Sequence, residues 1–316
     1  MKILTLLTVL LSLTASAAEP AQVLDSTAFV VEEAFFDAER GRAIAAALRA
    51  KKLDATLAGP ALAKAVTDAL WSIEDDGHLN VKFNEAKATE PLLSRDELRA
   101  RLDAPQVPKK SAGPVAVVSS RMLDGGVGYI EVPTFQPTPA AQDQLADAMK
   151  VIEGASSVIV DLRKNGGGSQ HLVDFLASYF FPADGRELMT MRTRHMPKPM
   201  TGYVMETPTR KFENVPLTIL ISEKTFSAGE AFAYLLQQYG RAKVVGAKTR
   251  GGGRPNRFVD IGGGYTVSVS IGTVTHPKTR TGWQSTGVIP DVAVPAEQAL
   301  EAALKAVPAR SARSQG

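Results

Sequence analysis

The sequence predicts an α/β protein whose core follows a small helical region. Beyond residue 114, short β-branched runs alternate with segments whose apolar residues recur at helical spacing, which is typical of a largely parallel sheet flanked by helices. From about residue 25 to residue 102 the apolar residues recur at helical spacing. The chain has 316 residues, 44% of them hydrophobic and 22% charged, which is enough for one large domain or for a core with a smaller companion.

The first 18 residues have the pattern of a secretory signal peptide. Lys2 is followed by an apolar run over residues 3–13 and by the small residues Ala15, Ser16 and Ala17, so we expect cleavage after Ala17 or Ala18. The run is shorter than the roughly 20 residues that cross a bilayer. We therefore expect export to the periplasm or the extracellular space, without stable membrane insertion.

Residues 19–105 are predicted to form an N-terminal helical domain. Gly59 and Pro60 suit the start of a helix that runs towards Ile73. Ser94 and Glu97 have the spacing of a capping box for a further helix. Residues 103–111 (DAPQVPKKS) have the turn-forming and polar content of a linker, which is expected over residues 106–113.

Residues 114–300 are predicted to form the core, and residues 301–316 a C-terminal tail. The expected strands are 115–118, 127–132, 158–162, 217–221, 244–245 and 265–271, and the expected helices are 140–152, 169–181 and 228–239.

Composition excludes several kinds of chemistry. Without any Cys the chain has no disulfide, thiolate nucleophile or cysteine-bound metal. The formal net charge of +3 is spread along the chain, so nucleic-acid binding is not expected. No two histidines have the spacing of a zinc-binding helix and no nucleotide-binding motif is present, so neither a metal nor another cofactor is expected.

Ser227 is a candidate nucleophile because it lies between a predicted strand and a predicted helix. A serine at such a turn projects its hydroxyl beside free backbone N–H groups and the positive end of the helix dipole. Spacing alone more often indicates an ordinary helix cap. Glu230, three residues further on, is expected to bond to the turn.

A glycine-rich loop follows the predicted strand at 158–162. Gly166, Gly167 and Gly168 expose their amides without side-chain obstruction, which suits an oxyanion hole. A tight turn that needs glycine for its backbone angles explains the same residues.

Among the four histidines, His78 is the best candidate for a general base. It lies in a polar segment where a helix gives way to a loop and a short strand, which suits a side chain that reaches another element. His276 is the reserve candidate. His171 and His195 are expected at the surface or in packing contacts.

Four separated segments resemble the tail-specific, or C-terminal processing, serine peptidase family. They are residues 161–168 (DLRKNGGG), 225–230 (TFSAGE), 245–252 (VGAKTRGG) and 277–291 (PKTRTGWQSTGVIPD). The chain is most similar to the branch with the tricorn-type peptidases and the interphotoreceptor retinoid-binding protein modules. The other branch has a serine–lysine dyad, and Gly252 stands here in place of that lysine. Only a short linker precedes the core, so no inserted PDZ domain is expected.

The resemblance implies a fold related to the crotonase and Clp protease core. It implies Ser227 as nucleophile and His78 as base, with an oxyanion hole formed by the amides of Gly167, Gly168 and Ala228. Relatives usually have Trp-Glu-Gly where this chain has Trp283, Gln284 and Ser285. Gln284 is thus expected to occupy the third catalytic position without a charge.

Three carboxylates are alternatives for the charge that Gln284 lacks, namely Asp75, Asp76 and Glu230. Each lies close in sequence to His78 or Ser227, and the spacing does not choose among them.

The sequence therefore predicts an exported serine peptidase that acts on peptides or unfolded proteins. The alternative is a weak or inactive relative that binds peptides or apolar ligands. A series of apolar side chains suits such a pocket, although loop and core packing explains it better: Phe180, Phe181, Met189, Met191, Met196, Met200 and Met205. A crotonase-type isomerase or hydratase fits the fold, but not the surroundings of Ser227 or the export signal. The oligomeric state is not predicted.

Overall fold

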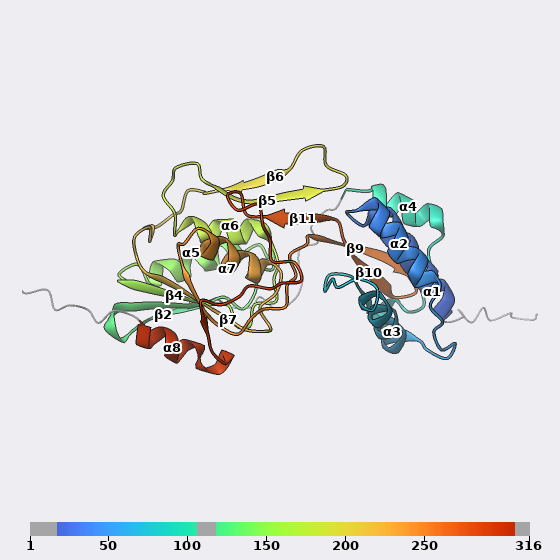
Figure 1. Ribbon diagram of the computed structural model, residues 1–316, viewed down its shortest axis with the longest axis horizontal. Coiled ribbons are helices and arrows are strands. Elements are labelled where there is room, and N and C mark those ends of the chain that lie inside the picture. Colours follow the sequence, from blue (N-terminus) through green and yellow to red (C-terminus); the bar gives the residue numbers. More distant parts are fainter. Residues whose placement is uncertain (1–17, 106–117, 307–316) are drawn as a thin grey trace, which may run out of the picture.

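The computed structural model describes residues 18–105 and 118–306 (Figure 1). The expected signal peptide, except Ala18, and the expected linker at 106–113 lie outside the described residues. So do residues 307–316 of the expected tail and most of the strand expected at 115–118.

A six-stranded mixed sheet forms the centre of the larger unit, with the order β12-β8-β7-β4-β3-β2. All neighbours are parallel except β2 and β3, which form an antiparallel pair. The strands are β2 (Ser119–Leu123), β3 (Val127–Glu131), β4 (Ser157–Asp161), β7 (Leu217–Ile221), β8 (Lys243–Gly246) and β12 (Val292–Ala293). This α/β core agrees with the predicted fold class.

Helices cover both faces of this sheet. On one face Val158 and Val160 of β4 pack with α5 (Ala141–Val151), α6 (Gln170–Ser178) and α7 (Ala228–Gln238). On the other face Ile159 packs with α8 (Ala299–Ala306). Burial on both faces explains why β4 reads as a continuous apolar run. Residues 301–306, expected in the tail, instead continue α8, because Ala303 has a place in this packing.

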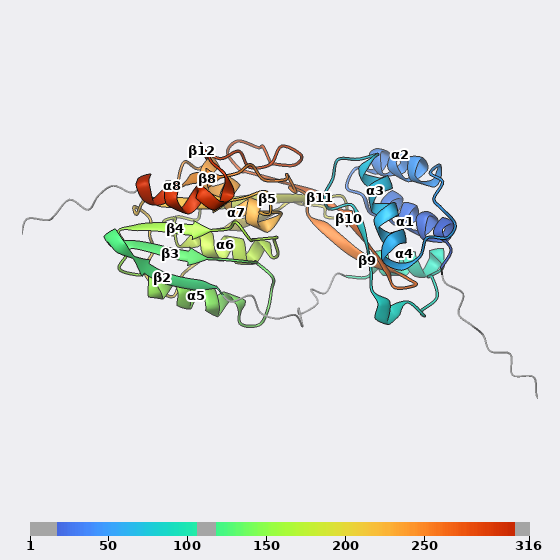
Figure 2. The same ribbon diagram turned by 90° about the horizontal axis from the view of Figure 1, so that it is seen from below.

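The smaller unit contains the expected N-terminal helices and a three-stranded sheet, β1-β10-β9. Its elements are α1 (Pro20–Ala34), α2 (Ala38–Arg49), α3 (Gly59–Trp71), β1 (Asn80–Phe83), α4 (Arg95–Asp103), β9 (Asn256–Gly262) and β10 (Tyr265–Ser270). The last two strands come from within the sequence range expected for the core. The small unit is therefore discontinuous in sequence, and Figures 1 and 2 show it at one end of the molecule.

Local signals place the helix starts in this unit. The Ser94 amide donates to the Glu97 carboxylate and the Ser94 hydroxyl accepts from the Glu97 amide, which confirms the predicted capping box. Asp37 caps α2 by accepting from the amides of Glu39 and Arg40. Short 3-10 turns occur at Glu85–Lys87, Asp124–Gly126 and Ala296–Gln298.

A third sheet, β11-β5-β6, lies over α6 and α7 on the side nearest the small unit (Figure 1). It contains β5 (Glu187–Thr193), β6 (Met200–Tyr203) and β11 (Gly272–Thr275), all antiparallel. His195, expected at the surface or in packing contacts, lies at an exposed position between β5 and β6. No helix among the described residues is long and apolar enough to cross a membrane.

Ile261→Ala tests whether β9 belongs energetically to the small unit. Ile261 is fully buried in a core whose strand β9 contacts α1 and α4, so its truncation should lower the free energy of unfolding by about 2–5 kcal/mol. Phe258 lies on the same strand with 55% of its surface exposed, and Phe258→Ala is the matched control, with a loss below about 1 kcal/mol. Denaturant unfolding measures both. Equal losses would contradict the assignment of β9 to this core.

Candidate active site

Ser227 occupies a sharp turn between β7 and α7. Its backbone has φ 53° and ψ −117°, a left-handed conformation that costs a non-glycine residue about 1–3 kcal/mol. The Phe226 amide donates to the Asn165 carbonyl and holds the turn against the glycine loop. The amide of Ala228, the first of α7, has no partner among the described residues, whereas the Gly229 amide donates to the Phe226 carbonyl.

Glu230 fixes this turn to the neighbouring loop. Its buried carboxylate accepts hydrogen bonds from the amides of Ser227 (2.8 Å), Gly251 (2.7 Å) and Gly252 (2.8 Å), and from the Thr249 hydroxyl (2.5 Å). Burial raises the pKa of Glu230 above its ordinary value, while these donors act in the opposite direction. The expected bond from Glu230 to the turn is confirmed, and the carboxylate also holds the loop.

His78 approaches Ser227 from the small unit. It lies in the loop between α3 and β1, and its Nε2 is 3.2 Å from the Ser227 hydroxyl oxygen. The imidazole is 5% exposed and lies 4.8 Å from the Phe226 ring, centroid to centroid. Burial lowers the pKa of His78 below its ordinary value of 6.5. At neutral pH the ring is therefore uncharged and able to accept a proton.

Asp76 places a negative charge beside this imidazole. Its carboxylate lies 4.0 Å from Nδ1 of His78 and also accepts the His78 backbone amide at 2.9 Å. The Ser270 hydroxyl (2.6 Å) and the Arg254 guanidinium (2.9 Å) bond to its other oxygen. The charge of Asp76 raises the pKa of His78, partly against burial, whereas Arg254 lowers it. Of the three candidate carboxylates, Asp76 is the one placed to act on His78, since Asp75 is exposed and Glu230 bonds to the turn.

Gln284 does not contact the imidazole, contrary to its expected catalytic position. Its side chain accepts from the Gly253 amide at 2.9 Å and donates to the Asp75 carbonyl at 3.3 Å and to the Ser285 hydroxyl at 3.4 Å. It therefore ties the 251–253 loop to the segment that precedes His78. The neutral amide of Gln284 bonds to backbone groups of both segments, and its role here is to position them.

The glycine loop lies directly against the nucleophile. A side chain at Gly167 would come within 2.8 Å of Cβ of Ser227 and 3.3 Å of the Ala228 amide, so glycine is required for this approach. The Gly167 amide is occupied, however, because it donates to the Asn165 side chain at 2.9 Å. The expectation that Gly167 is an oxyanion donor is therefore wrong. The amides of Gly168 and Ala228 have no partner within the described part of the chain, and both residues line the pocket beside Ser227.

Gly252 is closely surrounded at the place where the other branch has its lysine. A Cβ at this position would collide with the Phe226 ring and come within 3.0 Å of Cε1 of His78. The imidazole and its aromatic neighbour thus fill the space that a side chain at residue 252 needs.

The other histidines are remote from this arrangement or turned away from it. His276 is buried against Tyr239, with ring centroids 4.4 Å apart, at the opposite end of α7 from Ser227. Burial lowers its pKa to about 4. His171 bonds to Gln142 on the exposed side of α6. The reserve base candidate is therefore not at the site.

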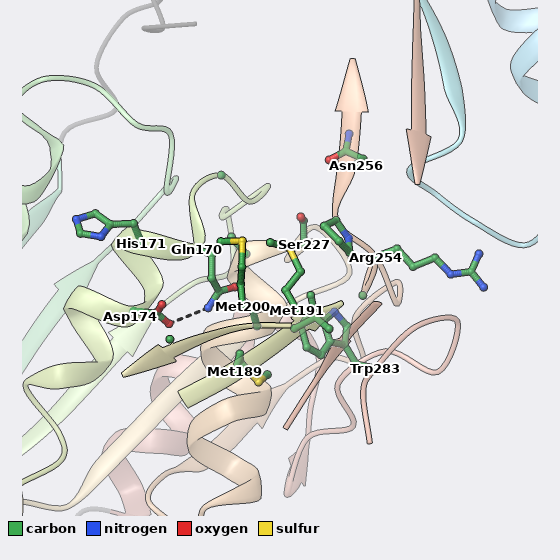
Figure 3. A pocket seen from close by; sticks show the side chains of 18 of the residues that line it. Gln170, His171, Asp174, Met189, Met191, Met200, Ser227, Arg254, Asn256 and Trp283 are labelled. Atoms are coloured by element: carbon green, nitrogen blue, oxygen red, sulfur yellow. Dashed lines mark hydrogen bonds between the residues drawn. The ribbon is translucent and has the colours of Figure 1, made fainter. Parts of the chain in front are cut away.

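A cavity of about 400 Å³ opens beside Ser227 (Figure 3). Met189, Met191 and Met200 line it, which corrects the interpretation of these residues as packing alone. Phe180 and Phe181 are buried in the core as expected. Trp283 and the buried Asp174 also line this cavity. Within residues 18–105 and 118–306, no cluster of three His, Asp or Glu side chains could hold a metal ion.

The comparison with protein families gives one match, to peptidase family S41 over residues 126–294, more than half of the chain. The matched range contains Ser227, the glycine loop and the 249–253 loop, whereas His78 and Asp76 lie outside it.

Similar sequences include two carboxyl-terminal processing proteases. CtpA of Bacillus subtilis is 28% identical over 165 residues, which are 52% of this chain and 34% of that protein. The carboxyl-terminal-processing protease of Synechocystis is 27% identical over 227 residues, 64% of this chain and 51% of that protein. The chain thus spans about a third to a half of the length of these relatives.

Solved structures share the fold over most of the chain. A putative peptidase from Parabacteroides merdae has a TM-score of 0.60 and 18% identity, covering 91% of this chain and 96% of that one. A lipoprotein from Streptococcus agalactiae has a TM-score of 0.56 and 16% identity, covering 93% and 98%. At such identities the likeness is one of fold.

Glu230→Gln tests the clamp on the nucleophile turn. An amide nitrogen cannot accept the hydrogen bonds that one carboxylate oxygen now accepts, so buried donors lose their partners. The free energy of unfolding should fall by about 1–3 kcal/mol, and the reactivity of Ser227 should fall with it. Glu223→Gln, at an exposed position two residues after β7, is the control. Denaturant unfolding measures the first effect, and an unchanged midpoint would contradict the clamp.

Proposed function

Because the chain belongs to peptidase family S41, we propose that it hydrolyses peptide bonds with Ser227 as nucleophile and His78 as general base. The observation that carries this proposal is the 3.2 Å contact between Nε2 of a buried, neutral His78 and the hydroxyl of Ser227. A nucleophile and base within hydrogen-bond reach are the requirement for this chemistry.

In the first step, Oγ of Ser227 attacks the substrate carbonyl carbon while its proton passes to Nε2 of His78. The carbonyl oxygen gains the negative charge and accepts hydrogen bonds from the amides of Gly168 and Ala228. Each donor of this kind is worth roughly 3–4 kcal/mol in the transition state. The intermediate collapses to an acyl-enzyme as the C–N bond breaks and Nε2 returns the proton to the leaving amine. Water then attacks the ester by the same path.

In this mechanism the negative charge of Asp76 stabilises the protonated form of His78. When His78 takes the proton, the imidazolium lies 4.0 Å from a carboxylate that is already held by Ser270 and Arg254. A charge that is fixed before the reaction needs no reorganisation during it. The neutral side chain of Gln284 does not supply that charge, and Asp76 makes it unnecessary.

An inactive peptide- or ligand-binding relative is less well supported. Such a protein has no need of a strained serine, an aligned imidazole and two free amides around the same point. We further propose that the mature chain is exported and acts on peptides or unfolded protein segments, because residues 1–18 have a signal-peptide pattern and the site is open to a cavity.

Labelling with a fluorophosphonate probe tests the nucleophile and the base. The wild-type protein should gain one adduct by intact mass as Oγ of Ser227 displaces fluoride from phosphorus. Ser227→Ala should gain none, and His78→Ala should react about 10²–10⁴-fold more slowly because the base is gone. His195→Ala, at an exposed histidine that does not line the cavity, is the matched control and should react normally. An adduct that persists in Ser227→Ala would refute the assignment.

The pH dependence of labelling tests Asp76. Protonation of His78 stops it from acting as a base, so the rate should fall as the pH drops, with a midpoint below 6.5. Asp76→Asn removes the charge that raises the pKa of His78, and the midpoint should move to still lower pH. Asp75→Asn, at the exposed neighbour, should leave it unchanged. A midpoint that rises in Asp76→Asn would contradict this role.

A further inference from the structure

The cavity beside Ser227 contains a buried carboxylate for which the proposed mechanism has no use. Asp174 lies in the second turn of α6 and is only 8% exposed, yet it lines the same cavity as Ser227, Gly168 and Ala228. Figure 3 shows Asp174 on one side of the cavity and Ser227 on another, with Met191 and Met200 between them in this view.

Asp174 has no positive partner among the described residues. One carboxylate oxygen accepts a hydrogen bond from the Gln170 side chain at 2.9 Å, and no ion pair is formed. The cation that also lines the cavity, Arg254, is bound to Glu74 and Asp76 instead. Burial raises the pKa of Asp174 to about 6, so the group remains mostly ionised at neutral pH. A buried charge without a counter-charge is costly, and a cation that arrives with a ligand relieves that cost.

Asp174 forms part of the cavity wall, and its carboxylate packs beneath β6. Gly202 of β6 faces it, and a Cβ at that position would collide with the carboxylate oxygens. Met189, Met191 and Met200 form an apolar wall of flexible side chains. The cavity therefore combines this apolar wall and one anionic group with the polar side chains of Gln170, Thr201 and Asn256. A long aliphatic side chain with a cationic end matches this combination, since its stem packs on apolar surface while its charge finds a partner.

We propose that Asp174 selects a lysine or arginine side chain at the residue whose carbonyl Ser227 attacks. This inference rests on the proposed peptidase function and adds its substrate class. The oxyanion donors Gly168 and Ala228 line the cavity together with Asp174, so the residue whose carbonyl they hold lies beside the cavity that its side chain would enter.

Fluorogenic peptide amides that differ only in this residue test the selection. Wild-type protein should cleave the Lys and Arg substrates with a kcat/KM on the order of 10²-fold above that of the neutral norleucine analogue. Asp174→Asn should remove most of that advantage while it changes norleucine cleavage less than about 3-fold. Retained norleucine cleavage also shows that the variant is folded. Asp143→Asn, an exposed carboxylate on α5, is the control and should keep the preference.

Two outcomes of this experiment would overturn the inference. One is a wild-type preference for norleucine over Lys and Arg. The other is an Asp174→Asn variant that loses activity equally on all substrates.

A binding measurement separates this inference from the proposed function. In Ser227→Ala, which cannot turn over, butylguanidinium should bind at least about 10-fold more tightly than the isosteric, neutral butylurea, because only the cation pairs with Asp174. Methyl NMR signals of Met189, Met191 and Met200 report the occupancy. The difference should vanish when Asp174→Asn is added. If no substrate is cleaved but the cation still binds in this way, the peptidase proposal fails and the cation site stands. Equal binding of the two probes would overturn the cation site itself.

Discussion

The buried carboxylate of Glu230 is the contact on which the rest of the site depends. It accepts hydrogen bonds from the nucleophile turn and from the loop at 249–252, and so fixes two segments that no secondary structure joins. Four donors on one carboxylate compensate for its burial and hold Ser227 in a left-handed conformation that the chain does not adopt freely. The same loop carries Gly252 past His78, so the position of the imidazole also depends on this contact.

The second constraint is that the small unit must be held against the large unit. His78 belongs to the small unit and Ser227 to the large one, and their contact requires the two to be held together. Strands β9 and β10 provide this hold because they leave the large unit directly after the 249–254 loop and complete the sheet of the small one. Arg254 and Ser270, at the two ends of this excursion, both bond to Asp76. The base His78 is therefore positioned by Asp76, which precedes Ser227 in the sequence, and through Asp76 by Arg254 and Ser270, which follow it.

Two buried carboxylates near the site have opposite electrostatic surroundings. Asp76 is paired with Arg254 and bonded to Ser270, so its charge is satisfied within the protein and available to stabilise an imidazolium. Among the described residues the carboxylate of Asp174 has only the amide of Gln170 as a partner, and it lines a cavity with an apolar wall of methionines. The first arrangement suits a permanent part of the protein, whereas the second suits a group whose counter-charge comes with a ligand.

The sequence by itself determined the α/β core, the capping box at Ser94, and the strand-to-helix turn at Ser227, because these depend on residues close together in the chain. Family-like segments also pointed to His78, although its 149-residue separation from Ser227 is bridged only by the fold. Tertiary structure decided the contacts between residues that lie far apart in the sequence. It placed Asp76, rather than Gln284, Asp75 or Glu230, beside His78, and it occupied the Gly167 amide with a hydrogen bond to Asn165. It also gathered the methionines of β5 and β6 around Asp174, since pairing between distant strands and burial of a charge arise only when the chain is folded.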